Sequence, residues 1–489
     1  MLLSRDGEGR RLGGPGGASW GMEGAVKDAN VAGNGRGSAF DFTLTHGVRS
    51  SDALERLSVL SEDLKALQFS STPSSREIQH LYALDDELRR AVSQVLSAPD
   101  ETELPVLDRV EGVRSAHVVL FDAYRSLAHS TGRAADPAFL TRYSAAGTER
   151  IKWHGHARHI PDEVVWSEIG ALFASTLNAG AGMVVGHDEG VRQEYLRALG
   201  FHSAALEQLS LPVFLAVDRL VSIALPFLVL VREPLPCVCY VIDPLNAPLP
   251  RRSTRPGSAQ GWFFSSAAAL ELLAELAEQL RQGVLPAGLD DGNFPTLTWL
   301  TAVVHLQRHW SPSPPLRRFR RHSVAAHLLV VSGFDAVVKV FDSDVLDVGP
   351  DVWVIRDLSR GGVGAAIDDP AASAPELGSF LAVRPQDGDS WHLGIVRRVR
   401  RNESGVEIGV ETLSQRPFFV SADDGRAPLK VFLCDQPLRG EAVRVIAGAG
   451  ALQVATPLFI TSEGAIQKLK PLDISLSGEG FDLRVYQVL

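Results

Sequence analysis

Three arginine clusters with the same spacing stand out in the sequence. RRSTR covers residues 251–255, RRFRR covers 317–321 and RRVRR covers 397–401. A guanidinium group can donate two parallel hydrogen bonds to a phosphate or carboxylate, and its flat face stacks on planar rings. Each cluster could therefore bind an anion, but the spacing by itself is equally typical of a solvated loop or strand face.

The middle cluster differs from the other two because a second polar pattern follows it. Asp357, Ser359 and Gly362 form the pattern D-x-S-x-x-G in DLSRGG, directly after the apolar run VWVI and an arginine. A carboxylate and a hydroxyl accept hydrogen bonds, and a glycine lets the backbone turn sharply or approach a ligand closely. The two patterns together offer both donors and acceptors to one ligand.

This combination resembles the PilZ domain, a bacterial receptor module for cyclic di-GMP, over about residues 315–420. The resemblance implies a six-stranded antiparallel barrel whose arginine-bearing N-terminal segment closes over the ligand. It also implies that cyclic di-GMP is the ligand and that no cofactor is needed. Matched residue by residue, the ligand-binding positions are Arg317, Arg318, Arg321, Asp357, Ser359 and Gly362.

The chemistry of cyclic di-GMP suits these residue types. Guanidinium groups can bind its two phosphodiesters, the O6/N7 edges of its guanines, or the faces of the bases. The opposite edge of guanine presents N1–H and an amine, so it needs acceptors such as Asp357 and Ser359. The sequence contains no motif for making or degrading the dinucleotide. We therefore expect a protein that senses this molecule and is not an enzyme.

The other two arginine clusters lack such a second pattern. RRSTR lies in a proline-rich stretch and is expected to be part of a linker. RRVRR lies on a predicted strand, where neighbouring residues face opposite sides. We interpret it as a solvated stripe, with a secondary nucleotide or partner contact as the alternative.

A histidine-rich stretch, WHGHARHI at 153–160, invites a metal interpretation. Its histidines are His154, His156 and His159. Arg158 stands directly before the last of them, where it would repel a cation, and no further histidine or aspartate cluster completes a ligand set. The His-Asp pair at 187–188 is equally isolated and is interpreted as a turn or helix cap. We expect a loop at 153–160 and no metal site.

The elements that must position these residues fall into two classes by their apolar period. From about residue 51 to 310, apolar residues recur at three and four positions, as in SDALERLSVLSEDLKALQ, which predicts helices. After Pro315 the period changes to two, in short runs such as AAHLLVVS, DAVVKVFD and VWVIRD that are separated by turn residues. Such spacing predicts a small antiparallel barrel, with further strands up to the C-terminus.

The predicted fold is multidomain α+β. Its parts are a disordered Gly-rich tail at 1–45, an all-α helical domain at 46–312, a PilZ-like six-stranded β-barrel at 313–425 and a small C-terminal β extension at 426–489. The helical domain carries no chemical motif and is a candidate partner-binding module. The segment SPSPP at 311–315 joins it to the arginine cluster, so a ligand that orders the cluster could reorient the two domains.

Composition excludes several other classes of protein. The formal net charge of −10 argues against nucleic-acid binding by the whole molecule. The longest apolar run, LVSIALPFLVLV, is too short for the about 20 residues that cross a bilayer. Three cysteines are too few for a disulfide scaffold, and the N-terminus lacks an apolar signal sequence. We therefore expect a cytoplasmic protein without a membrane span.

Two rival functions stay open. The first is a protein–protein interaction module whose barrel binds no nucleotide and whose helical half docks a partner. The second is single-stranded RNA binding through the basic barrel, which calls for aromatic residues among the arginines. Phe319 is the only aromatic residue inside RRFRR.

Overall fold

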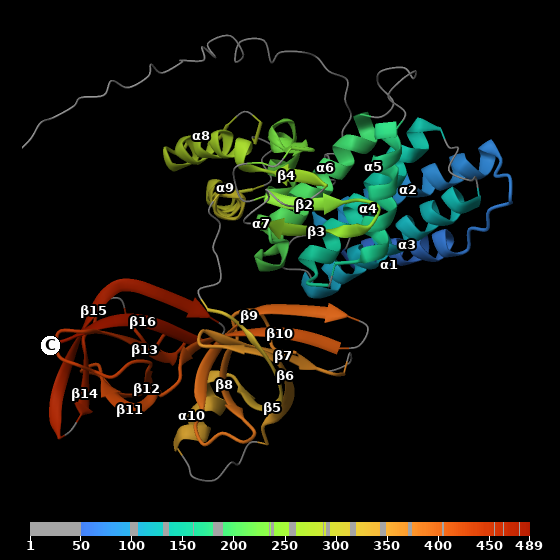
Figure 1. The fold of residues 1–489 in the computed structure, drawn as a ribbon. Helices are drawn as coiled ribbons and strands as arrows, with labels where there is room; N and C mark the ends of the chain where they lie inside the picture. The colour runs from blue at the N-terminus through green and yellow to red at the C-terminus, as the bar shows by residue number, and fades with distance from the viewer. Residues whose placement is uncertain are drawn as a thin grey trace, which may run out of the picture. The chain divides into compact units, whose positions relative to one another are not determined.

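The computed structural model divides the chain into an N-terminal part built mainly of helices and a C-terminal part built mainly of strands (Figure 1). It describes residues 50–97, 106–130, 136–159, 161–178, 189–233, 235, 239–253, 261–286, 288–289, 294–312, 319–342, 349–369, 374–402, 405–453, 455–462, 464–478 and 480–489. The predicted N-terminal tail, the His-Asp pair at 187–188, and both Arg317 and Arg318 lie outside the described residues.

The N-terminal helices follow the apolar periods of the sequence. They are α1 (Ser50–Lys65), α2 (Ser75–Leu96), α3 (Val106–Ser130), α4 (Pro137–His156), α5 (Glu163–Asn178), α6 (Glu189–Ser203) and α7 (Leu211–Ala224). Leu57, Leu60 and Leu64 of α1 are buried, as their three- and four-residue spacing predicts. A capping box starts α2, because Ser74 and Glu77 each accept a hydrogen bond from the backbone N–H of the other.

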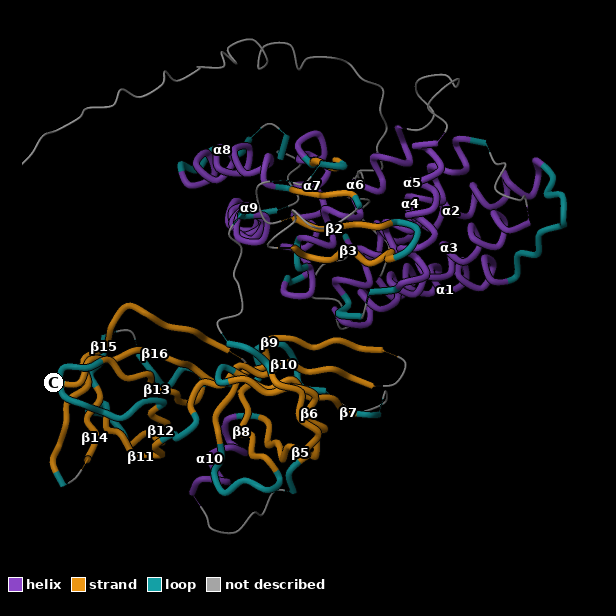
Figure 2. The backbone as a smooth tube through the Cα atoms, viewed as in Figure 1, coloured by secondary structure: helices purple, strands orange, loops and turns teal. Residues whose placement is uncertain are grey.

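A four-stranded antiparallel sheet follows these helices, so the prediction of an all-α domain was wrong for this segment. The strands are β1 (Val229–Val231), β2 (Cys239–Asp243), β3 (Ala247–Ser253) and β4 (Trp262–Ser265), in the order β1-β4-β2-β3. Figure 2 shows them among the helices. Runs of three to seven residues between proline-rich segments contain too few alternations to reveal a period of two. Helices α8 (Leu270–Arg281) and α9 (Thr296–Trp310) complete this part.

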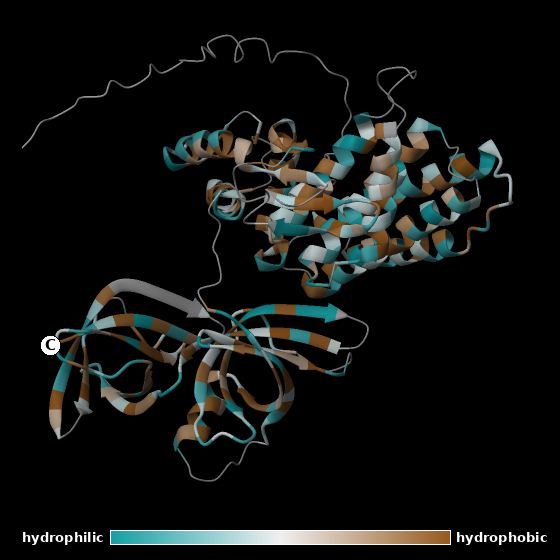
Figure 3. Ribbon diagram, viewed as in Figure 1, coloured by the Kyte–Doolittle hydropathy of each residue, from teal (hydrophilic) through white to brown (hydrophobic). Residues whose placement is uncertain are grey.

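The first barrel is a closed ring of six antiparallel strands, as predicted for this segment. The strands are β5 (His322–Ser332), β6 (Asp351–Ser359), β7 (Gly362–Ile367), β8 (Phe380–Pro385), β9 (His392–Asn402) and β10 (Gly405–Ser414), in the ring order β5-β6-β7-β10-β9-β8. Its interior is apolar and includes Leu328, Trp353 and Ile408. Apolar and polar residues alternate along the barrel strands in Figure 3, which is the period that predicted them.

A helix, α10 (Phe334–Asp342), occupies the run DAVVKVFD, which was predicted to be a strand. Phe334, Val337 and Phe341 stand at positions i, i+3 and i+7, so the same apolar residues also satisfy a helical period. All three join a second apolar cluster that includes Phe380 and Phe432. Tertiary packing thus decides between two local structures that the sequence pattern allows.

The C-terminal segment forms a second closed six-stranded barrel, larger than the small β extension that was predicted. Its strands are β11 (Phe418–Asp423), β12 (Pro428–Leu433), β13 (Ala442–Gly448), β14 (Leu458–Ser462), β15 (Ala465–Gly478) and β16 (Phe481–Val488). The ring order, β11-β12-β13-β16-β15-β14, repeats the order of the first barrel strand for strand. Because β11 belongs to this barrel, the boundary precedes Phe418 and does not fall at 425–426.

Helix lengths and apolarity bear on the expected lack of a membrane span. In the part of the chain that the structure describes, no helix combines the length and the hydropathy needed to cross a bilayer.

Candidate ligand site on the first barrel

The two polar patterns of the sequence meet in space. Arg321 directly precedes β5, and Asp357 lies near the end of β6, the strand that pairs with β5. The Nη1 of Arg321 donates to the Oδ1 of Asp357 at 2.5 Å, across a sequence separation of 36 residues. The side chains are 23% and 31% exposed, so water reaches both partners. The structure therefore brings a donor from the first pattern and an acceptor from the second into one site.

A two-residue turn at Arg360 and Gly361 joins β6 to β7 and sets the geometry of the second pattern. Ser359 and Gly362 face each other across this turn, and the Oγ of Ser359 donates to the carbonyl oxygen of Gly362 at 3.2 Å. The hydroxyl proton is thereby used, which leaves its oxygen as an acceptor. A Cβ at Gly362 would lie 2.2 Å from the carbonyl oxygen of Val410, so β10 passes too close for any other residue.

Two further glycines shape the outer wall of the barrel beside the ion pair. Gly364 on β7 faces Asp357 on one side and Gly409 of β10 on the other, and Gly409 in turn faces Arg398 of β9. The neighbours of both glycines in sequence belong to the barrel interior, so the glycines themselves face outward. We call Gly364 and Gly409 the glycine strip.

The glycine strip lets charged side chains lie against the barrel wall. A Cβ at Gly364 would lie 2.6 Å from the Oδ1 of Asp357 and 3.0 Å from the Nη1 of Arg321. A Cβ at Gly409 would lie 3.1 Å from the Cβ of Arg398. Sequence patterns did not point to Gly364, and they placed Arg398 in a solvated stripe with a nucleotide or partner contact as the alternative. Only the strand register shows that both residues stand in one row with Asp357.

The arginine segment also rests on the β6–β7 turn. A Cβ at Gly361 would lie 2.8 Å from the ring of Phe319, and the guanidinium of Arg360 lies 5.9 Å from the centre of that ring. Phe319 and Arg320 are exposed, whereas Arg321 is half-buried against Asp357. The described end of the RRFRR cluster thus contacts the DLSRGG turn at two points.

The second barrel carries a weaker copy of the same pattern. Asp435 lies just after β12, whereas Asp357 lies near the end of β6, and Gly440 stands five residues after Asp435, as Gly362 does after Asp357. Pro437 replaces the serine. Asp435 accepts two hydrogen bonds from the guanidinium of Arg444 of β13, at 2.8 and 2.7 Å, and a third from the backbone N–H of Arg444 at 3.3 Å. This copy lacks the serine hydroxyl, and its carboxylate already accepts hydrogen bonds from Arg444. It therefore offers a ligand fewer acceptors than the first barrel does.

The histidine-rich stretch at 153–160 departs from the predicted loop. Helix α4 continues through His156, whose ring stacks on Phe214 at 4.0 Å between centroids. The rings of His154 and His159 lie 5.2 Å apart. Among the described residues no group of three or more His, Cys, Asp or Glu side chains is arranged to hold a metal ion.

The other two arginine clusters converge where the sequence did not place them together. Arg252 of RRSTR lies on β3, and Arg398 and Arg400 of RRVRR lie on β9, yet all three line one cavity beside the end of α4. The backbone N–H of Arg401 donates to the carbonyl oxygen of Arg158 at 2.7 Å, which brings β9 to this end of α4. The predicted linker at 251–253 is therefore a strand at the wall of a cavity.

Comparison with known proteins gives no information on the function of the chain. No protein-family model matches the chain, and no curated protein is significantly similar to it in sequence.

Proposed function

We propose that the chain is a cytoplasmic effector that binds cyclic di-GMP on the outer wall of a PilZ-like first barrel and is not itself an enzyme. The observation that supports this most strongly is the contact between Arg321 and Asp357. Both residues were selected from separate sequence patterns, and the pairing of β5 with β6 brings them within hydrogen-bonding distance.

The residues at this site can divide the ligand between them. Arg321 uses one N–H group on Asp357 and retains the other donors of its guanidinium for a phosphodiester or the O6/N7 edge of guanine. Arg317 and Arg318 would add the same chemistry from the preceding segment. Asp357 and the oxygen of Ser359 would accept from N1–H and the exocyclic amine, and the β6–β7 turn would carry the base.

Binding would be passed on to a protein partner through the helical part of the chain. The residues that close on the ligand directly follow the segment at 311–315 that connects α9 to β5. Contacts between the arginine segment and the ligand would therefore pull on that connection and reorient the helical part. The reorientation would expose or cover a partner surface.

Titration calorimetry of the full chain with cyclic di-GMP tests the proposal. We expect micromolar binding or tighter, because each bidentate arginine contact discriminates by about 1–3 kcal/mol. Arg321→Ala and Asp357→Ala should each weaken binding at least tenfold, which corresponds to about 1.4 kcal/mol.

Arg416→Ala is the matched control, because Arg416 is exposed and stands just before β11 as Arg321 stands before β5. It should bind like the unmodified chain. Absence of heat with the unmodified chain at about 50 μM ligand would contradict the proposed function. Normal binding by both site variants would instead show that the ligand sits elsewhere.

A further inference from the structure

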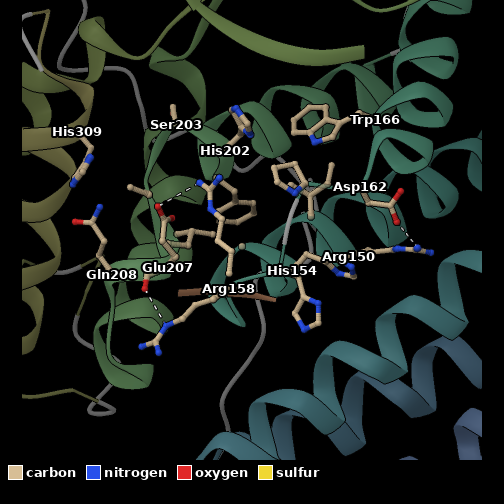
Figure 4. A pocket seen from close by; sticks show the side chains of 18 of the residues that line it. Arg150, His154, Arg158, Asp162, Trp166, His202, Ser203, Glu207, Gln208 and His309 are labelled. Carbon is tan, nitrogen blue, oxygen red and sulfur yellow. Dashed lines mark hydrogen bonds and ion pairs between the residues drawn. The ribbon is translucent and has the colours of Figure 1, made fainter. Parts of the chain in front are cut away.

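A cavity of about 490 Å³ lies beside the C-terminal end of α4, apart from the Arg321–Asp357 pair. Its lining comes from the end of α4, the start of α5, the end of α6, strands β2, β3 and β9, and the end of α9. Figure 4 shows the side chains around it, including Arg150, His154 and Arg158. The volume falls within the roughly 300–1,000 Å³ of small-molecule sites.

The charge of the lining is strongly positive, although the whole chain carries a net charge of −10. The cationic residues are Arg150, Arg158, Arg252, Arg308, Arg398 and Arg400. Among the described residues of the lining, the carboxylates are those of Asp162 and Glu207. Such an excess of guanidinium groups around a concave surface attracts and selects anions.

Only part of this charge is neutralised within the protein. Arg150 donates to Asp162 at 2.5 Å, and Arg400 lies 3.9 Å from the carboxylate of Glu207. Arg252 and Arg308 form no ion pair with any residue that the structure describes, and both are exposed. Two guanidinium groups at the cavity are therefore available to an anionic ligand without breaking an internal ion pair.

Two histidines add unused hydrogen-bonding atoms. The Nδ1 of His154 and the Nε2 of His309 are buried and have no partner among the described residues. Burial, together with neighbouring cationic side chains, lowers the pKa of His154 to about 3 and that of His309 to about 4. Both imidazoles are neutral at pH 7, and a bound anion would offset the burial cost that keeps them so.

The backbone at the cavity is left-handed at two non-glycine residues. Arg158 has φ 65° and Ala205 has φ 50°, and among the described residues no other non-glycine residue has a positive φ. Both residues line the cavity. At Arg158 this is the usual conformation after the end of a helix, because the N–H of His159 donates to the carbonyl oxygen of His154 and that of Arg158 to Gly155.

Planar side chains form another section of the lining. The rings of Trp166 and Tyr240 each meet the ring of His202 edge-on, with centroids 5.4 and 5.5 Å apart. All three line the cavity together with the arginines. A ligand that carries both a phosphate and an aromatic ring would match the two kinds of surface.

From this geometry we propose that the cavity is a second anion site, which binds a phosphorylated ligand of nucleotide size. Guanidinium groups would hold the phosphate, with Arg252 and Arg308 as the free donors, and the partly exposed ring of Tyr240 would face the base. The proposal does not depend on the barrel site, because the two free arginines lie on β3 and α9.

Calorimetric titration of the full chain with ADP, and separately with pyrophosphate, tests this. We expect binding of both probes, tighter for ADP because pyrophosphate lacks a ring. Arg252→Ala and Arg308→Ala should each weaken ADP binding at least tenfold, and both should fold normally because the two side chains are exposed.

Arg281→Ala is the matched control, because Arg281 is an exposed arginine at the end of the neighbouring helix α8. It should leave binding unchanged, as should Arg321→Ala of the barrel site. Failure of both probes to bind would overturn the proposal, and so would binding that survives in the Arg252 and Arg308 variants. Loss of ADP binding in Arg321→Ala alone would place the nucleotide on the barrel instead.

Discussion

At the scale of single residues, the barrel site depends on the absence of side chains as much as on charges. The Arg321–Asp357 pair can lie against the wall of the barrel because Gly364 has no Cβ. Strand register alone puts this glycine opposite Asp357, so its importance follows from the fold and not from a motif.

Gly364→Ala should therefore weaken cyclic di-GMP binding at least tenfold without removing any donor or acceptor. The new methyl group would displace the Arg321–Asp357 pair, whose atoms lie 2.6 and 3.0 Å from its position. Calorimetry measures the change, with Gly349→Ala as control because a Cβ at Gly349 meets nothing within 4 Å. Equal affinities of the two variants would contradict this role of the glycine strip.

His117 gives the helical part a dependence on pH. Burial lowers the pKa of His117 from 6.5 to about 4. Between pH 6.5 and pH 4 the unfolded chain therefore binds a proton at His117, whereas the folded chain does not. The free energy of unfolding is therefore unaffected by His117 above pH 6.5. It falls as the pH drops from 6.5 toward 4, by up to about 3 kcal/mol.

Urea unfolding at pH 7 and pH 4.5 measures this loss. His117→Leu, which cannot titrate, should lose less stability over the same pH interval than the unmodified chain. The comparison is of slopes, so a constant offset from repacking does not affect it. Identical losses in the two proteins would show that His117 is protonated when folded.

At the scale of elements, a buried network of charges connects α4, α6 and α7. Lys152 lies 2.6 Å from Glu149 and 2.8 Å from Asp218, and Arg197 lies 2.6 Å from Glu149. Burial opposes ionisation of Glu149, but Lys152 and Arg197 hold its pKa well below the usual range. The three helices are thus fixed by charges that compensate one another away from water.

Lys152→Ala should destabilise the chain by about 3–5 kcal/mol, because it leaves the buried carboxylates with too few cations. Lys65→Ala is the control: Lys65 pairs with Glu62 on the surface of α1, where such a pair contributes roughly 0–1 kcal/mol. Chemical denaturation followed by circular dichroism at 222 nm measures both. Similar losses in the two variants would contradict the compensating role of the network.

At the scale of the whole molecule, the two barrels repeat one strand order and share an apolar cluster. Phe380 of the first barrel lies 6.1 Å from Phe432 and 5.2 Å from Phe481 of the second, between ring centroids. Helix α10 adds Phe334 to the same cluster. Each barrel therefore completes part of its burial against the other, and we expect their stabilities to be coupled.

Phe432→Ala should reduce amide protection in β8 of the first barrel, although the substitution lies in the second. The cavity that it leaves should cost about 3–5 kcal/mol. Hydrogen exchange read by mass spectrometry on peptides covering 380–385 tests this coupling. Val443→Ala is the control, because Val443 is buried in the interior of the second barrel and not in the shared cluster. It should leave the exchange of β8 unchanged. Unchanged exchange of β8 in Phe432→Ala would show that the barrels are independent.

The sequence by itself predicted those features that depend only on residues close together in the sequence. The helices after residue 50 and the strands of the first barrel follow from apolar periods of 3.6 and 2. The turn after Ser359 follows from its glycines in the same way. These periods can be read from a short stretch of sequence, because the backbone geometry of a single helix or strand decides which of its side chains share a face.

The tertiary structure decided which distant residues share a site. Only strand pairing puts Asp357 beside Gly364 and Arg321, and only ring closure turns the C-terminal strands into a second barrel. The convergence of Arg252 with Arg398 also depends on how β3 and β9 are placed, and both were predicted to belong to solvated segments. Contacts of this kind are set by register and packing between elements, which the period of a single element does not contain.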